Sequence, residues 1–536
     1  HRYRHTQIRT KTQTQAHAEM SAPSGVSLSK KDLAERARVQ TRLKHVVAFL
    51  ACSAFQEIVG SVLVNEHSFA DGWFFHEFNN EVITEGQLVA TESLMRQWIQ
   101  EGSVQEDAIT REEVIRHFER DPVLYKDKLQ VLRMWRADPV PILRCGKDHV
   151  DYRLFRTDTN PKRLEACFQC NLFEGGMLIC FRDPWNPDVA DIFSADSPFP
   201  PLKDRNLLFD TCCENEDYGH RLDMDNVGAL NEKVYNKSIK DIVLVDEARH
   251  ERNFVLLVNK LVEAFPHKRI LCISGPSSSG KTSSAIRISN QLRAAGFQAL
   301  LIGMDNFYKH LSEVPVDSKG NYDFEVVESL DIADLADRLV RLCRGEAVPS
   351  RTYDFLTHEP MEHPEKPWKL GDKEIIIVEG IHGLNPAFTD LIGGGDRVTR
   401  VFVSALTQMN IDNSIHVSTS DNRLLRRILR DYNFRGYSAD VTLNRWGMVR
   451  AQENIQIFPD SIHADYFLNT SLIYEMAVLA NYCRTILAEV RSDKPDINEE
   501  AERLLTMLNL FYPLDDTLIP KNSIMREFTG GSVLDY

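Results

Sequence analysis

The chain lacks any long uninterrupted hydrophobic run. Its longest apolar stretch, residues 46–55, is interrupted by Ser53 and falls well short of the ~18 residues that suggest a membrane-spanning helix. We therefore expect no membrane partner. A secretory signal and a disulfide-type cysteine pattern are also absent, because the 10 cysteines are scattered over 536 residues. Reduced thiols and a cytoplasmic location are the expectation.

The chain also has no excess of positive charge. It carries 63 lysines and arginines against 78 aspartates and glutamates, a net charge of −15. This balance argues against nucleic acid or an anionic membrane as the main partner.

The cysteines lack the spacing of a structural zinc site. Cys167 and Cys170 have the usual two-residue spacer, but Cys212 and Cys213 are adjacent and far along the chain. Four ligands in two spaced pairs are typical of such sites. Buried thiols are therefore the expectation, and zinc is the alternative.

One short segment carries the strongest chemical signal. It reads Gly-x-x-x-x-Gly-Lys-Thr, follows an apolar run at 269–274 and opens a helix-compatible stretch at 283–295. In such a phosphate-binding loop, glycines let backbone N–H groups face the phosphates, and the helix N-terminus adds partial positive charge. The alternative is a chance match in a Ser/Gly-rich turn, which both flanks disfavour. The expected nucleotide-binding residues are Gly275, Pro276, Ser277, Ser278, Ser279, Gly280, Lys281, Thr282 and Ser283.

Two carboxylates follow predicted strands. Asp305 comes just after the strand expected at 298–303, and Glu379 ends an Ile/Val-rich run. Parallel α/β sheets place ligand-contacting residues at the carboxyl ends of strands. We expect Asp305 to be a general base, with a helix N-cap as its alternative role. Glu379 and the Thr282 hydroxyl are expected to hold Mg²⁺, with ATP as the cofactor that Lys281 contacts.

A row of arginines lies on the helix predicted for 421–431. Their spacing of i, i+3, i+4 and i+7 places them on one face, opposite four aliphatic side chains. A solvated charged face is the alternative, but few acids lie between them, which favours a phosphate clamp in a lid that excludes water. The row consists of Arg423, Arg426, Arg427 and Arg430, followed by Arg435.

Loops after Asp305 carry residues suited to an acceptor molecule. Asn321-Tyr322-Asp323-Phe324 is one such segment, and residues 353–358 are the other. Aromatic faces stack on bases, and carboxylates bind ribose hydroxyls.

Motifs of other nucleotide-binding classes are missing. A guanine-reading Asn-Lys-x-Asp should follow the loop, but the Asn-Lys pairs at 236–237 and 259–260 precede it, and neither continues to Asp. A transporter-type Leu-Ser-Gly-Gly is also absent. These absences exclude a guanine switch and a transporter ATPase.

The order of patterns predicts the domain organisation. Strands and helices alternate over 268–490, which is typical of a doubly wound parallel α/β domain. An α+β region is expected at 38–215. The remaining expectations are a disordered tail at 1–37, a helical linker at 216–267, and a C-terminal helix and tail at 491–536.

Together these segments resemble the uridine kinase/phosphoribulokinase family of P-loop kinases, over residues 268–470 and in the family's order. The resembling segments are 275–282, 304–308, 321–323, 353–358, 378–381 and 426–431. By this resemblance Asp305 is the base toward a 5′-hydroxyl, Asp323 holds ribose hydroxyls, and Tyr353 and His358 face the base.

The resemblance also implies a lid of cations. The catalytic candidates are Lys281, Asp305, Arg427 and Arg430, with Arg435 beside the nucleotide. The substrate-binding candidates are Asp323, Tyr353, His358, Arg427 and Tyr437. In pyrimidine nucleoside kinases an arginine and a glutamine stand where this chain has Tyr437 and Arg445. The acceptor therefore stays open between a nucleoside and a sugar.

A narrower subgroup, often labelled nucleoside or uridine kinase, is similar over nearly the whole chain after residue 40. In it, a region like the second additional domain of threonyl-tRNA synthetase precedes the kinase. The similar segments are 66–75, 144–146, 226–231, 380–386, 403–408, 419–423 and 526–532. The synthetase editing pair His-x-x-x-His is absent, because His45 is preceded by Thr41 and followed by Phe49. This argues against tRNA hydrolysis.

The sequence thus predicts an ATP-dependent kinase acting on the hydroxyl of a nucleoside, uridine-like by resemblance. A sugar or sugar-phosphate kinase and a nucleotide-binding sensor are the alternatives. The expected partner is a small-molecule acceptor, and a homo-oligomer is left open.

Overall fold

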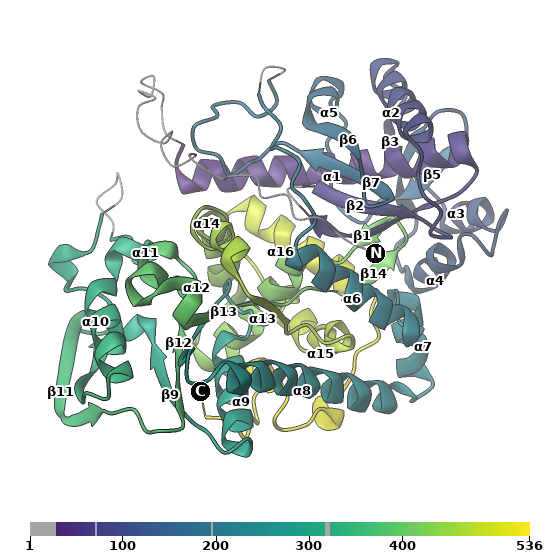
Figure 1. The fold of residues 1–536 in the computed structure, drawn as a ribbon. Helices are drawn as coiled ribbons and strands as arrows, with labels where there is room; N and C mark the ends of the chain where they lie inside the picture. The colour runs from purple at the N-terminus through teal and green to yellow at the C-terminus, as the bar shows by residue number, and fades with distance from the viewer. Residues whose placement is uncertain (1–27, 70–71, 195–196, 317–321, 408, 536) are drawn as a thin grey trace, which may run out of the picture.

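The protein is described here by a computed structural model (Figure 1), whose described residues are 28–69, 72–194, 197–316, 322–407 and 409–535. Residues 1–27 of the tail predicted over 1–37, and the acceptor candidate Asn321, lie outside these ranges, whereas residues 30–37 of that tail are helical. Within them, no helix combines the length and the apolar character needed to cross a membrane.

The N-terminal half is built on a long helix and an antiparallel sheet of order β1-β2-β7-β6. Ser29 and Asp32 form a capping box at the start of α1, and Gly60 ends it in the left-handed conformation. A second, three-stranded sheet has the order β3-β4-β5. The elements are α1 (Lys30–Val59), β1 (Leu63–Phe69), β2 (Gly72–Glu77), α2 (Glu85–Gln100), β3 (Gln105–Ile109), α3 (Arg111–Phe118), α4 (Lys126–Met134), β4 (Val140–Cys145), β5 (His149–Tyr152), α5 (Pro161–Cys167), β6 (Phe168–Phe173) and β7 (Gly176–Phe181).

Three helices connect this half to the rest of the chain. They are α6 (Leu207–Arg221), α7 (Val227–Tyr235) and α8 (Ile239–Ala264). The Pro- and Asp-rich composition of 138–210 predicts strands and loops, but the structure also has helices there, at α5 and at the start of α6. Asn160 caps α5 with Pro161 in its first turn, and Asn206 caps α6. Both caps are readable helix-start signals.

The C-terminal half contains a five-stranded parallel sheet of order β16-β13-β8-β12-β9. Successive side chains of β8 enter opposite cores: Ile270 and Cys272 one, Leu271 and Ile273 the other. Both faces are therefore covered, which confirms the predicted α/β fold with a parallel sheet. The central elements are β8 (Ile270–Ser274), α9 (Lys281–Ala294), β9 (Gln298–Gly303), β12 (Glu374–Glu379), β13 (Val398–Ser404) and β16 (Tyr466–Asn469).

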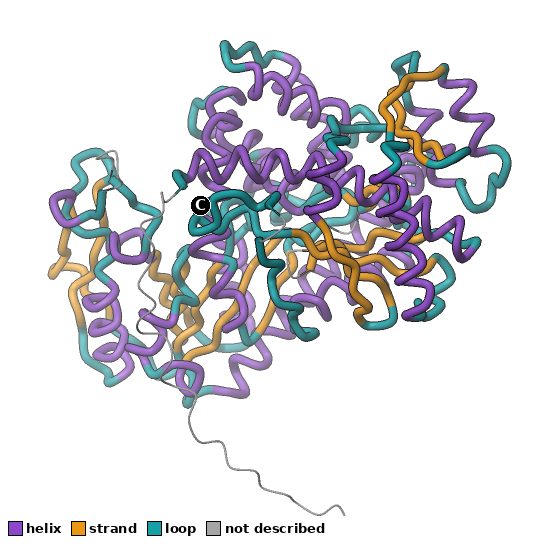
Figure 2. Tube along the Cα trace, turned by 90° about the horizontal axis from the view of Figure 1, so that it is seen from above, coloured by secondary structure: helices purple, strands orange, loops and turns teal. Residues whose placement is uncertain are grey.

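The remaining elements surround this sheet, and Figure 2 shows the strands passing beneath helices. The β10–β11 hairpin lies at the edge remote from the N-terminal half (Figure 1). These elements are the 3₁₀ turn Met304–Phe307, α10 (Ile332–Cys343), β10 (Val348–Asp354), β11 (Glu359–Trp368), α11 (Pro386–Thr389), α12 (Gly394–Arg397), β14 (Asn410–Asp412), β15 (Ile415–His416), α13 (Thr419–Phe434), α14 (Ala439–Gln452), the π-helix Glu453–Ile457, α15 (Glu475–Ala488), α16 (Pro495–Leu508) and α17 (Arg526–Thr529).

The two halves meet along α1 and α14. A Cβ on Gly447 would lie 2.9 Å from the Cβ of Ala34, so glycine permits the close approach of these helices. A buried ion cluster joins the halves elsewhere. Lys128 Nζ lies 2.8 Å from Asp151 and 3.0 Å from Asp412, and it donates to the Ser414 hydroxyl at 3.0 Å.

Candidate active site

The phosphate-binding loop lies between β8 and α9, as its sequence predicts. A Cβ on Gly275 would overlap the carbonyl oxygen of Val403, and a Cβ on Gly280 would overlap the Ile524 side chain. Gly280 also has a φ of 84°, in the left-handed region. Only glycine meets these demands without strain. The resulting bare backbone ahead of a helix N-terminus fits a triphosphate.

Residues far along the chain hold the back of this loop. The Ser277 backbone N–H donates to Glu453 at 2.8 Å, and the Ser277 carbonyl accepts from Arg423 at 3.0 Å. The Thr470 hydroxyl donates to the Ser279 carbonyl at 2.6 Å. These contacts fix the loop conformation from behind.

The prediction of a four-arginine phosphate clamp was wrong for two of its members. Arg423 and Arg426 are fully buried, and they pair with Glu453 at 2.6 Å and with Glu475 at 2.5 Å. Periodicity placed all four arginines on one face, but it could not show that two of them meet carboxylates. Arg423 and Arg426 therefore act on the loop's carbonyl groups rather than on a bound phosphate.

The other cations of the row remain beside the loop. Arg427 donates to the Ser277 hydroxyl at 2.8 Å, and Arg430 lies 3.5 Å from Glu527. Arg435 is more exposed and pairs with Asp431 at 3.1 Å. Tyr437 is exposed, and the Arg445 guanidinium lies over its ring, 5.0 Å from the ring centre.

Three charged groups converge on the start of α9. Burial lowers the pKa of Lys281, while the charges of Glu379 and Asp305 act in the opposite direction. Burial raises the pKa of Asp305 and of Glu379, and Lys281 opposes both shifts. Asp305 remains solvent-exposed although protein surrounds it closely enough to desolvate the carboxylate. The three groups form one electrostatic unit.

The structure also decides the alternative role of Asp305. The residue lies inside the 3₁₀ turn Met304–Phe307, whose N-cap is Gly303 and has no side-chain cap. The N-cap interpretation is therefore wrong. The Thr282 hydroxyl lies 3.4 Å from a Glu379 carboxylate oxygen. Two oxygen donors at that spacing, one of them a carboxylate, suit Mg²⁺.

The acceptor-side candidates form an aromatic cluster around the β10–β11 hairpin. The rings of Phe324 and His358 stack at 5.6 Å, and those of Tyr308 and Tyr353 lie 5.5 Å apart. Asp323 pairs with Lys30, at the start of α1, at 2.8 Å. The N-terminal half thus reaches the acceptor side of the site.

Several residues at this site were not predicted from the sequence. Glu453, Thr470 and Glu475 carry no motif of their own. The C-terminal segment adds Glu527, which contacts the Ser283 hydroxyl. The sequence does mark this segment, because residues 526–532 resemble the narrower kinase subgroup, but the resemblance implies no role for Glu527.

Comparisons with known proteins agree with this geometry. Residues 270–470 match the Phosphoribulokinase / Uridine kinase family. The uridine kinase of Macrococcus caseolyticus is 30% identical over 202 residues, which are 37% of this chain and 86% of that protein. The uridine kinase of Staphylococcus carnosus is 31% identical over 204 residues, with the same coverage of 37% and 86%. That of Chloroflexus aggregans is 28% identical over 198 residues, 37% of this chain and 84% of that protein.

The region matched by the family contains the phosphate-binding loop, Asp305, Glu379 and the arginine row. The N-terminal half lies outside the family match. The region supports a P-loop kinase that uses ATP and a small-molecule substrate. The chain belongs to the phosphoribulokinase/uridine kinase family.

Proposed function

We propose that the chain is an ATP-dependent kinase that phosphorylates a hydroxyl group of a uridine-like nucleoside. The supporting observation is the convergence of Lys281, Asp305 and Glu379, each of which influences the pKa of another. A base, a cation and a metal-binding carboxylate at one helix N-terminus are the parts that phosphoryl transfer requires.

Each residue has a proposed task. Residues 275–283 and Arg435 would hold the triphosphate, and Thr282 with Glu379 would hold Mg²⁺. Bound ATP·Mg²⁺ supplies the transferable phosphoryl group. Asp305 would accept the proton of the acceptor hydroxyl while the bond from the γ-phosphorus to ADP breaks and ADP leaves. Arg427 and Arg430 neutralise the charge that develops on the transferred group.

The acceptor would lie against the β10–β11 hairpin. Asp323 is proposed to bind ribose hydroxyls, and Tyr353 and His358 to face the base. Binding of a nucleoside at Asp323 has to compete with Lys30, its partner in the structure.

A sugar or sugar-phosphate acceptor is the second candidate. The observation in its favour is Tyr437, which stands where pyrimidine nucleoside kinases have an arginine and which is covered by Arg445. A tyrosine cannot supply the charge-assisted hydrogen bonds of an arginine.

For residues 38–215 we propose the resemblance to the second additional domain of threonyl-tRNA synthetase. Its antiparallel sheet packed against α1 and α2 is an α+β arrangement that supports this. A structural or sensing role fits better than tRNA hydrolysis, because α1 carries Thr41 and Phe49 at the positions of the missing histidines.

The test is Asp305→Asn, assayed with a panel of nucleosides and pentose phosphates. We expect turnover to fall by about 10²–10⁴-fold while ATP binding persists, because the substitution removes the base and leaves the loop intact. Asp337→Asn is the control, since Asp337 is exposed on α10 and pairs with Arg341. Persistent turnover would refute the base assignment. ATP hydrolysis without any phosphorylated acceptor would instead favour a sensor.

A further inference from the structure

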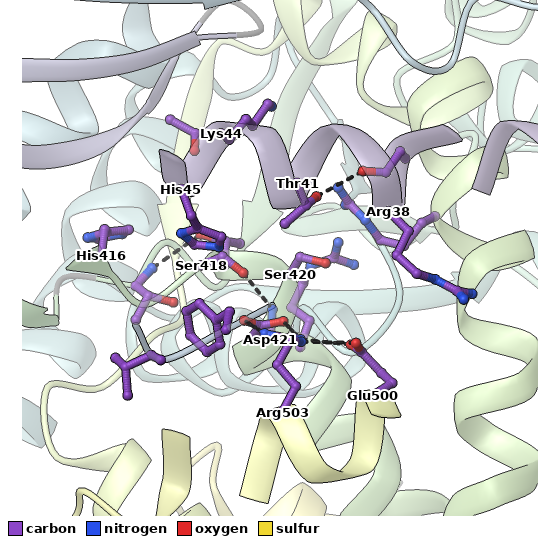
Figure 3. A pocket seen from close by; sticks show the side chains of 18 of the residues that line it. Arg38, Thr41, Lys44, His45, His416, Ser418, Ser420, Asp421, Glu500 and Arg503 are labelled. Atoms are coloured by element: carbon purple, nitrogen blue, oxygen red, sulfur yellow. Dashed lines mark hydrogen bonds and ion pairs between the residues drawn. The ribbon is translucent and has the colours of Figure 1, made fainter. Parts of the chain in front are cut away.

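A large cavity lies between the two halves of the molecule (Figure 3). It has a volume of about 910 Å³, within the range of small-molecule sites. Figure 3 shows α1 on one side, with Thr41 and His45 facing Asp421 and Arg503 across the space. Residues 275–282 do not line it, so it is separate from the phosphate-binding loop.

Basic side chains outnumber acidic ones in the lining of this cavity, although the chain as a whole is acidic. Its lining includes nine lysines and arginines against five aspartates and glutamates, whereas the whole chain has a net charge of −15. Several of the cations are neutralised locally. Arg503, for example, pairs with both Asp421 and Glu500. Others pair with acids outside the lining, as Arg153 does with Glu106 and Arg423 with Glu453.

Arg450 shares its acidic partner with another arginine of this lining. Among the described residues, Glu453 at 3.5 Å is its one acidic partner. The same carboxylate is already bound by the fully buried Arg423 at 2.6 and 2.8 Å, so two arginines share one negative charge. Burial and the Arg423 charge lower the pKa of Arg450 to about 10. A second anion at this position would relieve that repulsion.

Aromatic rings surround the same end of the cavity. The Arg450 guanidinium lies 5.9 Å from the Trp185 ring and 5.8 Å from the Phe458 ring. Trp446 lies 5.4 Å from Arg423. All four of these residues line the cavity beside Arg450. Flat apolar walls next to a cation suit a ligand that combines a planar ring with an anionic group.

We propose that this cavity binds a small organic anion with a planar ring, anchored by Arg450. The site exists independently of the proposed kinase activity, because it shares no lining residue with the phosphate-binding loop.

Binding there would be transmitted to the loop through one carboxylate. Glu453 contacts Arg450, Arg423 and the Ser277 N–H. When an anion pairs with Arg450, Glu453 interacts with Arg423 and with the Ser277 N–H alone. Its contacts to the phosphate-binding loop become stronger as a result. Linkage then requires that ATP and the anion favour each other's binding.

The experiment is calorimetric titration of the full chain with phenyl phosphate, benzoate and uridine 5′-monophosphate, each with ATP·Mg²⁺ at saturation. We expect binding of at least one probe, weakened tenfold or more by Arg450→Gln and retained in Arg450→Lys. Arg116→Gln is the matched control, because that side chain is 63% exposed on α3 and should leave binding unchanged.

A second variant protects the test against misfolding. Thr41→Trp places a bulky ring in the cavity from α1 without touching the buried arginines, and it should also remove binding. Phenyl phosphate binding without benzoate binding identifies phosphate as the anionic group, and the reverse identifies carboxylate. Uridine monophosphate alone identifies a nucleotide. Failure of all three probes, or binding unaffected by both Arg450→Gln and Thr41→Trp, would overturn the proposal.

Discussion

Two clusters of charged side chains inside the molecule differ in their balance of acids and bases. At the seam between the halves, Lys128 meets Asp151 and Asp412, with Asp127 nearby, so acids outnumber the base. Behind the phosphate-binding loop, Arg423 and Arg450 share Glu453, so bases outnumber the acid.

The difference separates a structural contact from a functional one. Lys128 donates to two carboxylates and to the Ser414 hydroxyl, so its hydrogen-bonding capacity is used within the cluster. Glu453 instead accepts a hydrogen bond from the Ser277 N–H of the phosphate-binding loop, and Arg450 lines a cavity. The first cluster joins two halves of the chain. The second supports a binding loop and leaves a cation available.

The largest effect is expected from Glu453→Gln. The substitution leaves the fully buried Arg423 without a counter-charge, which should lower the free energy of unfolding by about 3–5 kcal/mol. ATP affinity should fall as well, because the Ser277 N–H loses a charged acceptor. Denaturant unfolding and nucleotide titration measure the two effects.

Glu475→Gln is the matched control for that variant. It removes the partner of Arg426, which pairs at 2.5 Å, but the backbone N–H that donates to Glu475 is that of Leu472, outside the phosphate-binding loop. Stability should fall similarly, and ATP affinity should fall less. Equal losses of ATP affinity in both variants would contradict the special role given to Glu453.

Lys128→Met should cost about 3 kcal/mol of stability, because it leaves buried acids unpaired. ATP affinity of the folded fraction should stay at the wild-type value, since the cluster lies away from the phosphate-binding loop. Thermal unfolding and nucleotide titration at equal folded concentration test this. A large loss of ATP affinity would remove the distinction between the two clusters.

A pH dependence should distinguish the acid-rich cluster. Burial raises the pKa of Asp151 to about 6, above its value in an unfolded chain. The folded state therefore holds a proton that the unfolded chain releases between about pH 4 and pH 6, and stability falls as pH rises through this window. Relative to Asp151→Asn, the wild type should lose on the order of 2 kcal/mol across it. Urea unfolding of both proteins from pH 4 to pH 7 is the measurement, and a constant difference would contradict the assignment.

The smallest effect is expected from Ser414→Ala. It removes one hydroxyl that accepts from Lys128 and donates to Asp412, at a cost of about 1 kcal/mol. Ser93→Ala is the control, because its hydroxyl bonds only within α2, to the Val89 carbonyl on an exposed face. Indistinguishable stabilities for the two variants would mean that the cluster does not depend on this hydroxyl.

The sequence predicted what local patterns encode. The glycines of the loop, the apolar strands of the parallel sheet and the aliphatic side of α13 follow from motif and period. The partners of Arg423 and Arg426 did not, because Glu453 and Glu475 lie on other elements and only the tertiary fold brings them together. Lys30 meets Asp323 for the same reason, across 293 residues of chain.

The C-terminal segment has a consequence for how the protein is made. Ile524 fills the space against Gly280, and Glu527 contacts Ser283, so the loop's surroundings include residues synthesised long after the loop itself. A nascent chain still tethered to the ribosome near its C-terminus lacks this packing. The loop and α9 therefore reach the packing seen in the structure only once residues 524–527 have left the ribosome.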